Sequence, residues 1–246
     1  NPEGIRIGQE GNRNFRAVKV WDQRTFRDLD DSTELGTRNI KIALRRLRKF
    51  ARQGALDELD LDGTIKGTAH RGFLDIQMRA ERRNAVKVLL FFDIGGSMDW
   101  HIQQAEELFS AAKSEFRHMD YFYFHNCPYE RVWKENRRRH EAIIPTQELI
   151  RTYGSDYRLI FVGDAAMSPY EISHAGGSVE HWNAESGEAW MTRLTDHFAK
   201  AVWLNPVPAS RWGYTHSTLM LKQLMAGRMF PLSLEGLEGA MKALAR

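Results

Sequence analysis

Residues 86–98 read VKVLLFFDIGGSM, and this stretch decides the fold. The run from Val86 to Phe92 is apolar except for Lys87, and it is rich in β-branched and aromatic residues. Such a short, continuous run predicts a strand that is buried on both faces. The run stops at Asp93, and two glycines then permit a tight turn into the next element. The stretch therefore predicts a central strand of a parallel sheet.

Helical and strand patterns alternate along the chain after this strand. Apolar residues recur at helical spacing from Ile102 to Phe116, and an aromatic strand follows over 121–124. Further on, the pattern predicts a helix from Thr146, a strand over 158–164, a helix around 190–198, a strand over 201–205, a helix over 219–225, a short strand at 229–232 and a closing helix over 234–244. This alternation predicts a three-layer α/β fold, with a mostly parallel central sheet and helices on both faces.

The chain before residue 85 has a different pattern. Residues 1–16 are polar and rich in glycine, which predicts a flexible arm. Residues 17–84 are expected to form an N-terminal extension. It would contain a basic amphipathic helix from Ile40 and an antiparallel hairpin, because 59–65 and 73–78 alternate apolar and polar residues. We therefore expect one α/β domain over 85–246. Since the chain begins with Asn rather than Met, we expect it to start within a longer gene product or after processing.

Composition narrows the classes of protein to consider. The chain has 246 residues, and 35 basic against 32 acidic side chains leave a net charge of +3. That charge is too small to imply general nucleic-acid or membrane binding. The single cysteine, Cys127, excludes an internal disulfide framework and a Cys-rich zinc site, and it favours a reducing compartment. No apolar run reaches the roughly 18 residues of a membrane span, so we expect a cytoplasmic protein.

Two predicted core strands end in aspartate. Asp93 ends the first, and Asp164 ends the strand over 158–164. Because the carboxyl ends of parallel strands meet at one edge of a sheet, both carboxylates should lie there. Ser97 in the turn after Asp93 and Thr146 at another helix start would add hydroxyl groups. These hard oxygen ligands suit Mg²⁺, with Mn²⁺ or Ca²⁺ as alternatives, and so predict a divalent-cation site.

This pattern resembles the metal-ion-dependent adhesion site of the von Willebrand factor A family, which reads Asp-x-Ser-x-Ser, then a distant Thr, then a distant Asp. Asp93, Ser97, Thr146 and Asp164 fall on those places. Gly95 replaces the first serine, so the resemblance implies that water, or nothing, fills one ligand position. A serine at position 95 should then tighten metal binding modestly. Ile-Pro stands directly before Thr146, where the family usually has Gly-Gly.

Residues 90–98 and 202–206, with the basic segment and hairpin before them, resemble more narrowly the CoxE-like branch, over roughly residues 57–207. Proteins of this branch are thought to work beside MoxR-type AAA+ ATPases in the maturation of metal-containing enzymes or complexes. The resemblance implies a non-enzymatic, Mg²⁺-dependent interaction module that serves such an ATPase and a client protein. The residues expected to contact a partner are Gly95, Gly96 and Asp99 beside the metal, and Arg45, Arg46 and Lys49 on the basic helix.

An enzyme and an RNA-binding protein are the alternatives. A phosphatase-like, metal-dependent hydrolase needs a base or nucleophile, and Asp99 and His101 are the candidates beside the motif, although polar residues are also common in a helix's first turn. In a purely structural interpretation, Ser97 or Asp99 caps the following helix, a role compatible with metal binding. RNA would bind the basic segments 38–52 and 137–140. We favour an anionic protein surface as their target.

Other motifs point to no further activity. The chain lacks the Gly-x-x-x-x-Gly-Lys-Ser/Thr phosphate loop, so any ATPase activity would belong to a partner. Ser97 does not lie in a Gly-x-Ser-x-Gly elbow, which disfavours a serine hydrolase. We interpret Cys127, which follows an aromatic strand, as buried packing rather than a nucleophile. His174, His181 and Trp182 are interpreted as parts of a partner-facing surface loop rather than zinc ligands.

Overall fold

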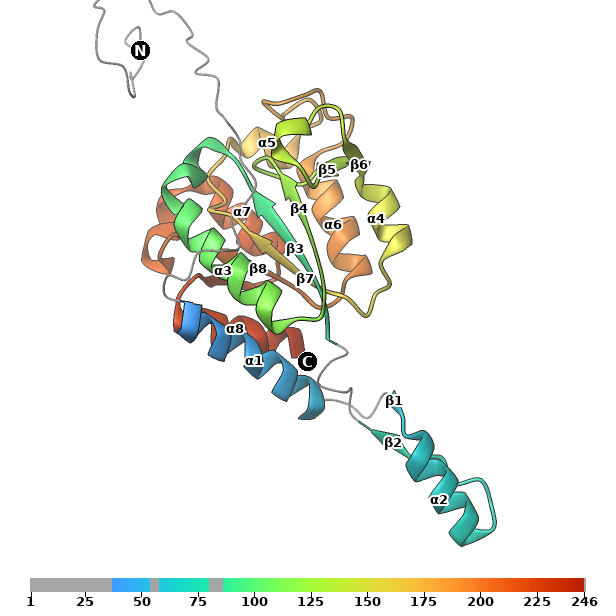
Figure 1. Ribbon diagram of the computed structural model, residues 1–246. Coiled ribbons are helices and arrows are strands. Elements are labelled where there is room, and N and C mark those ends of the chain that lie inside the picture. Colours follow the sequence, from blue (N-terminus) through green and yellow to red (C-terminus); the bar gives the residue numbers. More distant parts are fainter. Residues whose placement is uncertain (1–36, 54–57, 80–85, 246) are drawn as a thin grey trace, which may run out of the picture.

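The computed structural model describes residues 37–53, 58–79 and 86–245. Its main feature is a seven-stranded sheet of order β6-β5-β4-β3-β7-β8-β9 (Figure 1). The strands are β3 (Lys87–Asp93), β4 (His118–Phe124), β5 (Arg131–Trp133), β6 (Ile143–Pro145), β7 (Arg158–Val162), β8 (Ala201–Asn205) and β9 (Met229–Pro231). Strands β4, β3, β7, β8 and β9 run parallel, whereas β5 and β6 join antiparallel. The predicted mostly parallel sheet is confirmed.

Helices cover both faces of this sheet. One face carries α1 (Thr37–Gln53), α3 (Ile102–Glu115) and α8 (Leu234–Ala245), and the other carries α4 (Thr146–Thr152), α5 (Pro169–Ser173), α6 (Gly187–His197) and α7 (His216–Leu224). Short 3-10 helices are η1 (Gly96–His101), η2 (Asn136–Arg138) and η3 (Ala209–Tyr214). Because side chains alternate along β3, Leu90 packs toward α3 while Leu89 and Phe91 pack toward α6. The predicted three-layer α/β architecture is confirmed.

The basic helix α1 is a packed part of this architecture. Leu44 and Leu47 are fully buried between α1 and its neighbours α3 and α8. Two of its arginines pair with acidic residues of those helices: Arg45 Nε lies 2.9 Å from Glu115 Oε1, and Arg46 pairs with Glu238. Lys49 belongs to α1, but its side chain lies outside the described residues. The apolar face of α1 and two of its cations are therefore engaged within the chain.

Residues 58–79 form a small unit that lies apart from the sheet in Figure 1. Strands β1 (Glu58–Leu59) and β2 (Met78–Arg79) pair antiparallel, but α2 (Leu61–Arg71) occupies most of the first predicted hairpin arm. The strand prediction over 59–65 was wrong because local capping favours a helix: the Asp60 carboxylate accepts a hydrogen bond from Gly63 N. Gly72, at φ 74°, then ends α2.

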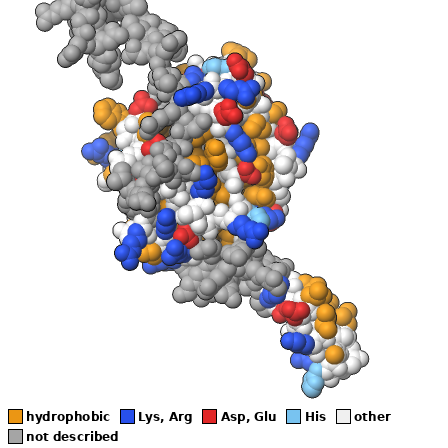
Figure 2. All heavy atoms as spheres, viewed as in Figure 1, with side chains coloured by type: hydrophobic (Ala, Val, Ile, Leu, Met, Phe, Trp, Pro, Cys, Tyr) orange, Lys and Arg blue, Asp and Glu red, His pale blue; other side chains and the backbone are white. Residues whose placement is uncertain are grey.

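This unit exposes apolar side chains (Figure 2), which are Leu59, Leu61, Ile65, Phe73, Leu74, Ile76 and Met78. In the part of the chain that is described, no helix combines the length and apolar character needed to cross a bilayer. The predicted flexible arm at 1–16 and the following residues to 36 lie outside the described residues.

Candidate metal centre at the carboxyl ends of β3 and β7

The two predicted aspartates leave neighbouring strands at the same edge of the sheet. Phe92 pairs with Val162, so Asp93 lies level with Gly163, the residue before Asp164. Asp93 and Asp164 are only 5% and 4% exposed. A Cβ atom at Gly163 would lie 2.9 Å from Asp93 Cβ and 3.1 Å from its Oδ2, so only glycine lets β7 approach this carboxylate so closely.

The two oxygens of the Asp93 carboxylate differ in their hydrogen bonding. Oδ1 accepts two hydrogen bonds of 2.7 Å, from the backbone nitrogens of Gly95 and Asn126. Oδ2 is buried and has no hydrogen-bond partner among the described residues. Such a buried, unpartnered oxygen costs free energy unless another group contacts it. Burial, and then the nearby charges of Asp164 and Glu171, raise the pKa of Asp93 to about 8. A cation between these carboxylates would offset both costs.

Asp164 is fixed by hydrogen bonds to its carboxylate and to its backbone. Its Oδ1 accepts from Ala166 N at 2.9 Å, and its carbonyl accepts from the amide of buried Asn205 at 2.8 Å. The preceding residue is held too, because the Trp203 indole donates to the carbonyl of Gly163 at 2.7 Å. Trp203 and Asn205 belong to β8, so the neighbouring strand fixes the backbone that carries the second carboxylate.

The residue after Asp164 has an uncommon backbone conformation. Ala165 has φ 58°, in the left-handed region that side chains other than glycine and asparagine rarely adopt. Helix α7 holds it there, since the hydroxyls of Ser217 and Thr218 donate to the Ala165 carbonyl at 2.8 and 3.2 Å. Ser217 Oγ also accepts from Met167 N at 3.2 Å. Strained backbone next to a buried carboxylate is typical of functional sites.

The two predicted hydroxyl ligands differ in placement. Ser97 Oγ lies 3.4 Å from the Ala166 carbonyl, and Ala166 N is bonded to Asp164, so Ser97 borders the site. Thr146 is fully buried, and its hydroxyl donates to the Tyr129 carbonyl at 2.5 Å. Strands β4 and β5 separate β6, which precedes Thr146, from β3. The structure therefore brings Asp93, Ser97 and Asp164 together, whereas the described contacts of Thr146 lie elsewhere.

Asn126 is a site residue that the sequence interpretation missed. A Cβ atom built on Gly95 would lie 2.0 Å from Asn126 Oδ1. Serine at position 95 would therefore require the Asn126 side chain to move, and the expected tightening of metal binding stays a prediction. The signal was available: Asn126 follows β4 at the same edge of the sheet as Asp93. Its polar side chain could have been found by the rule that identified the aspartates.

The side chains at this site offer metal-binding oxygen atoms of three kinds, from carboxylate, hydroxyl and amide groups. Among the described residues, no group of three or more His, Cys, Asp or Glu side chains is arranged to hold a metal ion. The site offers two carboxylates instead, with the Ser97 hydroxyl and the Asn126 amide oxygen beside them. Mg²⁺ suits such a set, because it is commonly held by one or two carboxylates and keeps several waters.

The residues expected to face a partner lie at the edge of this site. Gly96 and Asp99 are exposed, whereas Gly95 is buried. Asp99 and His101 both belong to η1, which begins directly after Gly95. The start of η1 thus places exposed residues beside the two carboxylates, which are themselves buried.

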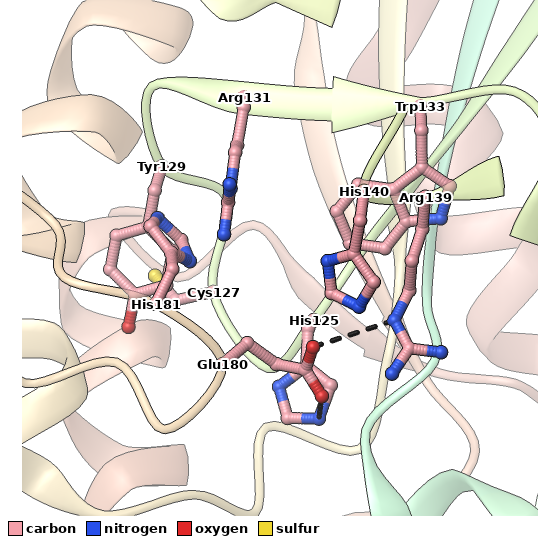
Figure 3. A pocket seen from close by; sticks show the side chains of 9 residues that line it. All are labelled: His125, Cys127, Tyr129, Arg131, Trp133, Arg139, His140, Glu180 and His181. Atoms are coloured by element: carbon pink, nitrogen blue, oxygen red, sulfur yellow. Dashed lines mark ion pairs between the residues drawn. The ribbon is translucent and has the colours of Figure 1, made fainter. Parts of the chain in front are cut away.

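A pocket lies at the end of β4, where His125 and Cys127 contribute to its lining (Figure 3). It is lined by His125, Cys127, Tyr129, Arg131, Trp133, Arg139, His140, Glu180 and His181. Glu180 lies between an imidazole and a guanidinium group, 3.6 Å from His125 Nε2 and 3.4 Å from Arg139 Nε. Because Glu180 belongs to the segment between α5 and α6, these ion pairs attach that segment to the end of β4.

Cys127 and His181, which the sequence suggested as packing and as part of a surface loop, both line this pocket. Cys127 is fully buried, and burial raises the pKa of its thiol further, which agrees with packing rather than nucleophilic chemistry. His181 does not simply face outward: its Nε2 lies 2.8 Å from Glu130 Oε1. Burial, and then the charge of Arg131, lower the pKa of His181. Trp182, the next residue, is 79% exposed.

No protein-family model, no curated protein and no solved structure matches this chain. The geometry of the site, together with the sequence motif, is therefore the basis for a functional proposal.

Proposed function

We propose that this chain is a von Willebrand A-like protein of the CoxE-like type, which binds Mg²⁺ through Asp93, Ser97 and Asp164. The ion would hold an acidic side chain of a partner protein. The observation that carries the proposal is the buried pair of carboxylates, one of which has an oxygen without a hydrogen-bond partner among the described residues. Two carboxylates leave a divalent ion incompletely coordinated, so a partner's carboxylate can enter its shell through a charge-assisted contact.

The surface around the site supports a protein partner. Four aromatic side chains, here called the aromatic rim, are 65–88% exposed: Trp100, Tyr170, Trp182 and Tyr214. Each belongs to a segment that follows the carboxyl end of β3, β7 or β8, the edge at which both aspartates lie. Exposed aromatic residues are enriched at protein interfaces and often supply much of the binding energy. The aromatic rim could thus bind the surface of a partner protein around the acidic side chain that the ion holds.

The identity of the partner is proposed from the sequence resemblance. A MoxR-type AAA+ ATPase, or the client protein on which it acts, would dock at this edge in the cytoplasm. The chain would act as a non-enzymatic adaptor, since it has no phosphate loop of its own.

The basic segments give less support to RNA as the ligand. Arg45 and Arg46 pair with Glu115 and Glu238 on neighbouring helices. In the second segment, Arg139 lies 3.4 Å from Glu180. Because these cations already have acidic partners within the chain, less free positive charge remains for a nucleic-acid backbone. The metal edge is the better candidate for the docking surface.

A phosphatase-like hydrolase is the enzyme alternative. In-line attack would need a base or nucleophile at the buried carboxylates, and the exposed Asp99 is the nearest acidic residue along the chain. We expect the purified protein with Mg²⁺ to leave phosphate esters and nucleotides unhydrolysed. Turnover that follows the protein through purification and disappears in Asp93→Asn would favour the hydrolase instead.

Affinity capture from the native host tests the proposed function. The wild-type chain should retain an AAA+ ATPase or its client, identified by mass spectrometry, in Mg²⁺ and release it in EDTA. A charge-assisted contact of about 1.5–3 kcal/mol corresponds to a factor of about 10 to 150 in affinity, so Asp164→Ala should lose the partner.

Loss in EDTA has a second possible cause, because an ATPase can itself require Mg²⁺ to assemble. The Asp164→Ala variant, checked for folding by circular dichroism, therefore decides. If it still captures the partner while charge reversal at Arg45, Arg46 and Lys49 releases it, the basic helix is the docking surface and the metal proposal is wrong.

A further inference from the structure

We propose that Asn126 supplies, through its side-chain oxygen, the metal ligand that Gly95 does not provide, and that Glu171 positions it. This inference rests on the proposed Mg²⁺ site and assigns one more ligand to it. It is carried by the juxtaposition of three residues from separate segments: Gly95 after β3, Asn126 after β4 and Glu171 in α5.

The side chain of Asn126 fills the space beside Gly95. An ideal Cβ atom at Gly95 would lie 2.0 Å from Asn126 Oδ1 and 3.1 Å from Asp93 Oδ1. The amide oxygen of Asn126 thus occupies the volume in which a side chain at position 95 would begin. A serine at position 95, as in the motif, would place its hydroxyl in this same volume. The Asn126 amide oxygen, which follows β4, therefore takes the place of the serine hydroxyl.

Hydrogen bonds to Glu171 fix the orientation of the Asn126 side-chain amide. Asn126 Nδ2 donates to both carboxylate oxygens of Glu171, at 3.1 and 3.0 Å. Since a carboxylate accepts and the NH₂ group donates, the nitrogen faces Glu171 and the oxygen is directed to the Gly95 side. Glu171 is only 2% exposed, and its Oε1 also accepts from Ser168 N at 3.2 Å in the capping box of α5. A buried, fixed acceptor therefore holds Asn126 in one orientation.

The backbone conformation of Asn126 lets it contact Asp93 directly. Its φ is 59°, a left-handed conformation that asparagine tolerates better than most residues. In this conformation its backbone nitrogen donates to Asp93 Oδ1 at 2.7 Å. The same residue thus binds the first aspartate through its main chain and presents a second oxygen donor beside it.

Exchange of the two positions tests the assignment by calorimetric titration with Mg²⁺. Asn126→Gly removes the amide but keeps access to the left-handed backbone, and we expect at least about tenfold weaker binding. Gly95→Ser alone should lower the melting temperature, because the new side chain clashes with Asn126. The double variant Gly95→Ser with Asn126→Gly removes that clash and returns a hydroxyl, so it should recover most of the lost affinity.

A spectroscopic measurement on the wild-type chain does not depend on variants that fold poorly. With Mn²⁺ as the probe and ¹³C-labelled asparagine, pulsed electron paramagnetic resonance should detect a ¹³C coupling of the strength expected for a coordinated amide. The coupling should be absent from the double variant. Absence of the coupling in the Mn²⁺-loaded wild type, or unchanged Mg²⁺ affinity in folded Asn126→Gly, overturns this inference alone. If the wild type binds neither ion, the proposed function fails, and this inference with it.

Discussion

The carboxylate of Asp164 at the end of β7 raises the pKa of Asp93 at the end of β3. Burial is the larger cause, and with a further contribution from Glu171 the pKa of Asp93 reaches about 8. Two buried carboxylates in this arrangement repel each other when both are ionised. Without a cation, the folded chain therefore keeps a proton on Asp93 at neutral pH, whereas the unfolded chain releases that proton near its ordinary pKa of 3.8.

The first prediction concerns the pH dependence of stability in EDTA. The folded chain binds the Asp93 proton up to about pH 8, whereas the ordinary pKa is 3.8. The free energy of unfolding should therefore include a contribution from this group that is fully present below about pH 4 and is lost as the pH rises toward 8. Asp93→Asn cannot titrate, so its stability relative to wild type should increase between about pH 5 and pH 8. Urea unfolding across this range measures the difference, and a constant difference would contradict the prediction.

The second prediction concerns the support of the Asp164 turn. Ser217→Ala removes the hydroxyl that donates to the Ala165 carbonyl and accepts from Met167 N. Because the Ala165 carbonyl is buried and Met167 N is partly buried, we expect a loss of about 2 kcal/mol in the free energy of unfolding. The matched control is Ser173→Ala, whose exposed hydroxyl donates to the Pro169 carbonyl and should change stability by less than about 0.5 kcal/mol. Equal effects of the two substitutions in chemical unfolding would show that Ser217 does not hold the turn.

The third prediction concerns α1 as a structural layer of the domain. Leu44 is fully buried against α3 and α8, so Leu44→Ala should lower the free energy of unfolding by about 2–5 kcal/mol. Ile42, on the same helix, is 42% exposed, and Ile42→Ala should cost less than about 1 kcal/mol. Thermal and urea unfolding compare the two variants. A Leu44→Ala variant as stable as Ile42→Ala would mean that α1 is not part of the folded core.

The sequence predicted the elements whose side chains are patterned by burial. The central strand could be found because β3 is buried on both faces, and the strand predicted over 201–205 is β8 with the same bounds. The aspartates followed from a topological rule, because parallel strands place their carboxyl ends at one edge. For these features the local pattern and the tertiary environment agree.

The missed features depend on interactions that a linear pattern does not show. In α2, one capping aspartate and a left-handed glycine outweighed a short alternating pattern. Strands β5 and β6 have three residues each, too few for a period to be recognised. Asn126 follows β4 at the edge that holds the aspartates, so the same rule could have indicated it, but the space that its side chain fills beside Gly95 is visible only in the packed structure.

The central claim is that Asp93 and Asp164 form one divalent-cation site, and calorimetric titration with Mg²⁺ tests it most directly. The wild-type chain should show a single binding site, with Mn²⁺ binding to the same site in competition. Asp93→Ala and Asp164→Ala, each confirmed as folded by circular dichroism, should show no binding, while Ser173→Ala should titrate like wild type. Titrations of Asp93→Ala that cannot be distinguished from those of wild type would contradict the claim and remove the metal from this site.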